Sequence, residues 1–175
     1  SNLIKNKKIT STSILLASAI FFYINNCSNK TNPVLKSKNI FVSSDGDDIN
    51  PGTFRKPWKT LERVNRHTFN AGDTIFFSKN SNFSGGLLIS DSGTKDKPIV
   101  LTYYGDGHPP KFTNPDINFL NGNMIQIKGD YIIIDGLYFH NGVSVSKEDT
   151  VSARSIGGIY LTLGADNNIV KNCEM

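Results

Sequence analysis

The chain has 175 residues, which fits one domain of ordinary size, and 38% of them are hydrophobic. Its formal net charge of +4 is uneven, because three lysines and no acidic residue lie in the first 26 positions; without these lysines, 16 basic residues face 15 acidic ones, a net charge of +1. No basic stripe remains, which argues against a nucleic-acid-binding protein. The 15 glycines and the modest apolar content favour short strands and many turns over long helices.

The first 26 residues have the pattern of an export signal. A basic segment at Lys5, Lys7 and Lys8 precedes an apolar run over residues 14–24, which is shorter than the roughly 20 residues of a membrane-spanning helix. Cys27 follows, and this order resembles a bacterial lipoprotein signal in which the cysteine is lipidated. Asn25 and Asn26 depart from the small residues usual there, so ordinary secretory cleavage and an uncleaved anchor stay open.

These features predict three segments: a signal peptide over 1–26, a polar linker over 27–38, and a folded region over 39–175. The protein is expected to be exported, held at the membrane by a lipid anchor only, and monomeric. Cys173 is the other cysteine, and its apolar surroundings predict a buried free thiol. The strand pattern runs to Met175, so we expect the folded region to continue beyond it.

The folded region opens with a strand over 39–43 and a polar turn over 44–53. The aspartates of this turn do not have the spacing of a calcium-binding EF-hand loop, so we interpret it as structural and assign no metal site. A short amphipathic helix is predicted over 57–67, with Pro57 in its first turn and Trp58, Leu61 and Val64 on one face. That face should cover the open end of a stacked sheet.

Strands are predicted next within 71–77, 86–90 and 98–103, with turns at 91–97 and 106–110. The last third repeats: residues 123–141 match 158–175 with an offset of 36, which aligns Asp130 with Asp166 and Ile133 with Ile169. Three short strands should begin near 125, 132 and 137, and 143–155 should be a loop inserted between the copies.

Short strands of this kind are stable only when each pairs with its equivalent in the next copy. The sequence therefore predicts an all-β fold, a right-handed parallel β-helix or solenoid with a short N-terminal capping helix. A β-sandwich, which also consists of short strands and turns, remains the alternative.

Several segments resemble the N-terminal cap and first coils of pectate-lyase-like β-helix proteins. They are residues 41–43, 50–53, 56–61, 71–77, 92–94, 97–100, 104–107 and 131–137. The resemblance implies a carbohydrate-active protein whose catalytic residues lie on later coils, with calcium in that later sequence as an expected cofactor of a lyase.

Within this chain we assign no catalytic residue. His108, His140, Asp135 and Asp166 are interpreted as structural, and Lys147, Glu148, Asp149 and Arg154 as a charged loop that could border a substrate groove. The leading hypothesis is an exported polysaccharide lyase that cleaves uronate-containing glycans by β-elimination. A non-catalytic glycan-binding or surface protein and a β-helix glycoside hydrolase are the alternatives, and the polysaccharide is the expected partner in each case.

Overall fold

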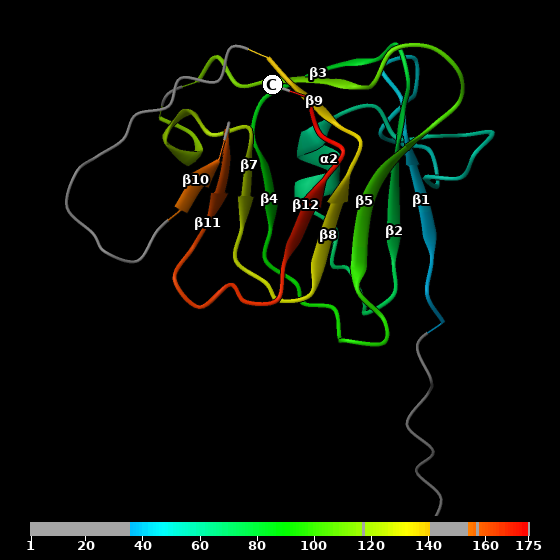
Figure 1. The fold of residues 1–175 in the computed structure, drawn as a ribbon. Coiled ribbons are helices and arrows are strands. Elements are labelled where there is room, and N and C mark those ends of the chain that lie inside the picture. Colours follow the sequence, from blue (N-terminus) through cyan, green and yellow to red (C-terminus); the bar gives the residue numbers. More distant parts are fainter. Residues whose placement is uncertain (1–35, 117, 141–153, 157, 175) are drawn as a thin grey trace, which may run out of the picture. The chain divides into compact units, whose positions relative to one another are not determined.

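The computed structural model describes residues 36–116, 118–140, 154–156 and 158–174 (Figure 1). The signal segment, Cys27 and most of the linker therefore lie outside the described residues. Among those described, no helix is long and apolar enough to cross a bilayer. The regular elements are β1 (Asn39–Val42), α2 (Leu61–Asn65), β2 (Thr74–Ser78), β3 (Asn82–Ser84), β4 (Leu87–Ile89), β5 (Ile99–Tyr104), β6 (Lys111–Thr113), η1 (Leu120–Gly122), β7 (Ile125–Ile127), β8 (Ile132–Asp135), β9 (Tyr138–Phe139), β10 (Arg154–Ile156), β11 (Ile159–Leu161) and β12 (Ile169–Lys171).

The strands form three sheets, and successive copies add one strand to each. The sheet orders are β1-β2-β5-β8-β12, β10-β11-β7-β4 and β3-β6-β9. Within the described residues, every pair of named strands is parallel except β10 with β11. The fold is thus all-β with parallel sheets, and the β-sandwich alternative is wrong, because sandwiches are built from antiparallel strands.

The core consists of apolar side chains that alternate along each strand with outward ones. In β8, Ile132 and Ile134 are buried while Ile133 and Asp135 are partly exposed. Three phenylalanines occupy equivalent inward positions of β3, β6 and β9: Phe83 pairs with Phe112, and Phe112 with Phe139. Their ring centroids are 5.3 and 5.8 Å apart. Identical side chains thus stack from one copy to the next.

The predicted repeat pairs in register, with one correction to its spacing. Ile169 pairs with Ile133 and Lys171 with Asp135, an offset of 36. In the neighbouring sheet, however, Ile159 pairs with Ile125, an offset of 34. The expected constant offset was wrong there, because the connection from Leu161 to Ile169 is two residues longer than the equivalent connection from Ile127 to Ile133.

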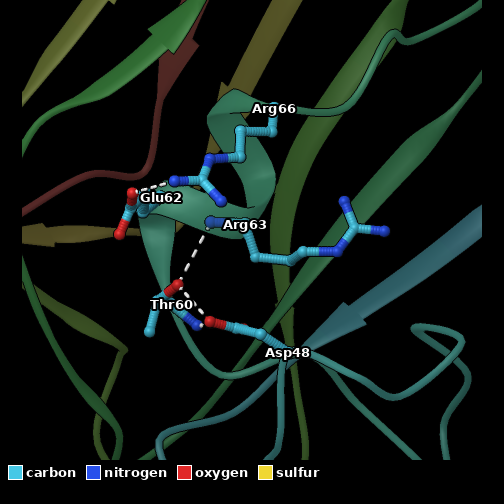
Figure 2. A network of polar contacts seen from close by, with 5 residues as sticks. All are labelled: Asp48, Thr60, Glu62, Arg63 and Arg66. Carbon is cyan, nitrogen blue, oxygen red and sulfur yellow. Dashed lines mark hydrogen bonds and ion pairs between the residues drawn. The ribbon is translucent and has the colours of Figure 1, made fainter.

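The helix is shorter than predicted. Thr60 is its N-cap with extended backbone, so Pro57 and Trp58 precede it, and Trp58 forms a bridge with Val42. The reason is Asp48, whose Oδ1 accepts hydrogen bonds from the N–H groups of Lys59 and Thr60 and holds them outside the helix. Figure 2 shows the contact of Asp48 with Thr60. Trp58, Leu61 and Val64 are nevertheless all buried, as their spacing predicted.

Asn65, the last residue of α2, attaches the helix to the edge strand β4. Its side chain donates to the Gly86 carbonyl and accepts from the Leu88 N–H, both at 2.9 Å. The helix therefore lies at the open edge of a sheet, where the sequence placed it. Of the predicted inserted loop, residues 143–153 lie outside the described part, and its end is corrected: Arg154 and Ser155 belong to strand β10.

Candidate functional site

A hollow with two acidic side chains in its wall lies between α2, the turn before β4 and the segment after β6. Its volume is about 360 Å³. Its lining residues are Leu61, Glu62, Asn65, Ser84, Gly85, Gly86, Asn114, Pro115, Asp116 and Phe119. Two acidic side chains therefore face one hollow from elements that are about 50 residues apart in sequence.

The two amide side chains of the hollow build its walls. Asn114 is buried; its Nδ2 donates to the carbonyls of Phe119 and Asn123 at 3.0 and 2.8 Å, and its Oδ1 accepts from the Asp116 N–H. The side-chain amide of Asn65 is likewise used by the backbone of Gly86 and Leu88. Because both amides are used internally, the groups that remain for a ligand are the carboxylates, Ser84 and the exposed ring of Phe119.

The carboxylates are held differently. Glu62 forms an exposed i,i+4 ion pair with Arg66 on the helix (Figure 2). Asp116 is exposed, and its Oδ1 accepts from the Asn118 N–H at 2.9 Å. The lining contains no basic side chain. Acidic groups beside an exposed aromatic ring suit the hydroxyl groups and apolar face of a neutral sugar better than they suit a uronate.

The hollow lies next to β4, an edge strand of the sheet that contains β4, β7 and β11. On the outer face of this sheet, Leu88, Gln126 and Tyr160 are register partners, and all three are partly exposed. Gly86 of the hollow precedes β4 directly, and a Cβ there would lie 2.6–2.9 Å from the side chains of Leu120 and Phe119. The absence of a side chain at Gly86 thus lets Phe119 approach β4 and line the hollow.

A second depression of about 350 Å³ lies over β8 and β12. It is lined by Lys95, Pro98, Tyr131, Ile133, Asn167, Asn168 and Ile169. Asn168 is occupied by the backbone of Ile132 and Gly129. This lining contains no acidic side chain, so the first hollow is the better candidate.

The structure places the residues singled out in the sequence apart from this hollow. His108 is exposed in a turn in which Asn80 Oδ1 accepts from its N–H, and His140 Nδ1 lies 2.8 Å from the Tyr138 hydroxyl. Asp166 is a turn residue whose N–H donates to Asp130 Oδ1. No hydrogen bond or ion pair joins the side chains of His108, His140, Asp135 and Asp166 within the described part of the chain.

Asp135 has a more specific environment than a turn residue. Asn172 Nδ2 donates to its Oδ1 at 2.8 Å, and Lys171 Nζ lies 3.3 Å from its Oδ2. The hydrogen bond from Asn172, together with Lys171, lowers the pKa of Asp135 although burial opposes the shift. This pair connects β8 to β12 rather than forming a reactive group.

Lys147, Glu148 and Asp149 lie outside the described residues, and of Arg154 only the backbone position in β10 is described. Across the described ranges, no three His, Cys, Asp or Glu side chains are grouped closely enough to hold a metal ion. Cys173 is a free thiol but only partly buried; burial raises its pKa.

Sequence reasoning missed Glu62, Asp116 and Phe119 as a group. Segment 111–122 contains a three-residue strand and a single helical turn, so it has no periodicity that would have pointed to it. The available signal was Asn114-Pro115-Asp116, a turn-forming segment directly after a strand.

Comparison with known proteins gives likenesses of fold only. No family model matches the sequence, and no curated protein sequence matches it. The chain is similar to crystal structures of GH136 lacto-N-biosidase from Eubacterium ramulus, as the selenomethionine derivative (TM-score 0.52, 23% identity) and the native protein (TM-score 0.51, 22% identity). It is also similar to a rhamnogalacturonan lyase, with a TM-score of 0.56 and 17% identity.

Each likeness covers 78% of this chain but a much smaller share of the other protein. The shares are 26% and 24% of the lacto-N-biosidase chains and 36% of the lyase. The chain thus spans about a quarter to a third of the length of these structures.

Proposed function

We propose that residues 39–175 are part of a right-handed parallel β-helix in an exported, polysaccharide-active protein. The main observation in favour of the β-helix is the order of the strands in the sheets. Each copy contributes one short parallel strand to each of three sheets, in register with the copy before. Right-handed connection is the general rule for parallel strands of one sheet. Action on glycans is supported by the neighbours, a lacto-N-biosidase and a rhamnogalacturonan lyase.

The proposed reaction is β-elimination on a uronate-containing glycan. A base removes the proton beside the sugar carboxylate, the bond from the neighbouring carbon to the glycosidic oxygen breaks, and that oxygen takes a proton, which leaves an unsaturated uronate. The support is the lyase neighbour and the cap resemblance. The hollow at Glu62 and Asp116 contains no basic residue, so we assign it no role as the base.

The assay follows the ultraviolet absorbance of the unsaturated product. The complete natural protein is incubated with pectate, alginate and chondroitin, and a rise on one of them is expected. The 175-residue chain alone is expected to be inactive. If this chain is active, Lys147 and Arg154 become the first candidates for the catalytic base. If the complete protein is inactive on all three polysaccharides but is retained on a glycan column, the non-catalytic alternative is supported.

A glycoside hydrolase is the second candidate, and a specific observation favours it. Glu62 and Asp116 line one hollow with an exposed aromatic ring, and paired carboxylates are the usual catalytic groups of glycosidases. A hydrolase would release reducing ends without an absorbance rise. Glu62→Gln and Asp116→Asn should then each abolish release, whereas Asp106→Asn, which changes an exposed acid that does not line the hollow, should retain it.

We also propose that Cys27 anchors the protein to the bacterial cell envelope. The support is the order of basic segment, apolar run, cysteine and polar linker in the sequence. A fatty-acid analogue supplied to an expressing bacterial host should label the wild type and not Cys27→Ala. Equal labelling of both, or none of the wild type, would remove this proposal.

A further inference from the structure

A cluster of four aromatic rings lies on the outer face of the sheet formed by β1, β2 and β5. Phe41 of β1 stacks on its register partner Phe76 of β2, with centroids 5.0 Å apart and planes at 12°. Tyr104 of β5 meets Phe41 edge-on at 5.2 Å. Phe54 completes the cluster, 5.6 Å from both Phe41 and Tyr104.

Phe54 comes from a tight hairpin and remains largely in solvent. Thr53 and Lys56 exchange two backbone hydrogen bonds of 3.0 Å, so Phe54 and Arg55 form the tip. The side chain of Phe54 is 63% exposed although it touches two other rings. Contact with the cluster therefore orients the ring but leaves most of its surface open.

The chain builds the same hairpin a second time without an aromatic residue. Residues 52–57 read Gly-Thr-Phe-Arg-Lys-Pro and residues 93–98 read Gly-Thr-Lys-Asp-Lys-Pro. Thr94 and Lys97 exchange the equivalent backbone hydrogen bonds, of 2.9 and 3.1 Å. Since this framework folds with Lys95 at the first tip position, the turn itself does not require Phe54.

The aromatic tip has two cations beside it. Arg55 and Lys56 are exposed, and neither side chain has an ion pair with a described residue. Two of the three acids of the 44–53 turn accept backbone hydrogen bonds: Asp47 Oδ1 accepts from the Ile49 N–H, and Asp48 accepts from Lys59 and Thr60. The third, Asp45, forms no ion pair with a described residue. An open ring with two unpaired cations complements a sugar ring that carries a carboxylate.

We propose that Phe54, Arg55 and Lys56, supported by Phe41 and Tyr104, form a binding site for an acidic polysaccharide chain, separate from the hollow at Glu62 and Asp116. The ring of Phe54 stacks on the apolar face of a sugar, and the two cations bind its carboxylate. The choice of a glycan as ligand rests on the proposed function. The site would hold a polymer while the reaction takes place elsewhere.

The test measures retardation of the whole 175-residue chain in native gels that contain polygalacturonate or, as the uncharged comparison, dextran. Retardation is expected with polygalacturonate only and should weaken with added salt. Phe54→Ala should reduce the apparent affinity about fivefold, and Arg55→Gln with Lys56→Gln should reduce it at least as much. The matched control is Lys95→Gln with Lys97→Gln, which removes two charges from the equivalent hairpin and should change nothing.

Three outcomes would overturn the site: no retardation of the wild type, equal loss in the control pair, or binding to anionic lipid vesicles in place of glycan. Melting temperatures of all variants show whether Phe54→Ala weakens binding by destabilising the fold. If it does, Phe54→Leu is measured instead, because it keeps an apolar side chain over Phe41 but lacks the flat ring; weaker binding by this variant is expected, and unchanged binding would overturn the site. If the complete protein has no lyase activity but Phe54-dependent binding persists, the reaction proposal fails and this site stands.

Discussion

Asn168 completes the backbone hydrogen bonding of Ile132, a residue one copy earlier in the repeat. Its Oδ1 accepts from the Ile132 N–H at 2.7 Å, and its Nδ2 donates to the Gly129 carbonyl at 3.0 Å. Both backbone groups flank Tyr131, which has a positive φ of 55°. One side chain thus replaces the strand ladder at the corner where the chain turns into β8.

Asn168→Ala should destabilise the protein by about 1–3 kcal/mol, because it leaves an N–H and a carbonyl without partners at a half-buried corner. Chemical denaturation measures this directly. Asn118→Ala is the matched control, since Asn118 is exposed and donates to Asp116 through its backbone N–H, which the substitution keeps. Equal losses in the two variants would show that the carboxamide of Asn168 has no special role.

Gly52 should tolerate a methyl group less well than Gly105, although both have positive φ values, of 77° and 83°. A Cβ on Gly52 would lie 2.8 Å from the Trp58 indole, whereas a Cβ on Gly105 would meet nothing within 4 Å. Gly105→Ala should therefore lower the free energy of unfolding only by the cost of placing alanine in a left-handed backbone conformation, about 1–2 kcal/mol. Gly52→Ala should lose more because Trp58 must also move; similar melting temperatures for the two variants would contradict this.

Much of the fold could be predicted from the sequence because apolar residues alternate along β1, β2, β5 and β8, and because the repeat is clear around Ile133 and Ile169. Strands β3 and β6 escaped prediction. Each has three residues and buries a single side chain, Phe83 or Phe112, so neither produces an alternation. Their position depends on stacking with the next copy, which is a contact distant in sequence.

The candidate site was less accessible to sequence reasoning for a related reason. Glu62 lies on a helix whose start is set by Asp48, and Asp116 lies in a segment held by Asn114. Neither carboxylate is recognisable alone as a binding residue, and only the folding of α2 against β4 brings them to one hollow. The aromatic cluster likewise joins Phe41, Phe54 and Tyr104 from three separate segments.

Asp48 should matter more to stability than its neighbour Asp47. Asp48 accepts from the N–H groups of Lys59 and Thr60 and from the Thr60 hydroxyl, while Asp47 accepts from the Ile49 N–H alone. Asp48→Ala should lower the free energy of unfolding by about 1–2 kcal/mol, and Asp47→Ala should lower it less. Urea denaturation of the two variants compares them, and a larger loss in Asp47→Ala would refute the assignment of Asp48 as the residue that sets the helix start.

His67 should make the protein less stable in mild acid. Its ring lies between Trp58 and Phe69, with centroids 5.1 and 4.9 Å away, and its Nε2 is buried without a hydrogen-bond partner among the described residues. Burial lowers the pKa of His67, and the positive charges of Arg63 and Lys38 lower it further, although Asp73 and Asp91 oppose the shift.

Because the folded pKa of His67 lies below the unfolded value of about 6.5, the unfolded chain binds more protons in the window between the two values. Stability is therefore complete above about pH 6.5 and falls as the pH drops through this window. Melting temperatures measured from about pH 7.5 to about pH 5 should decline in the wild type and decline less in His67→Phe, which keeps a flat ring but cannot be protonated. His108→Gln, a change in an exposed turn, should decline as the wild type does. If His67→Phe follows the wild-type curve, the acid sensitivity arises at another residue.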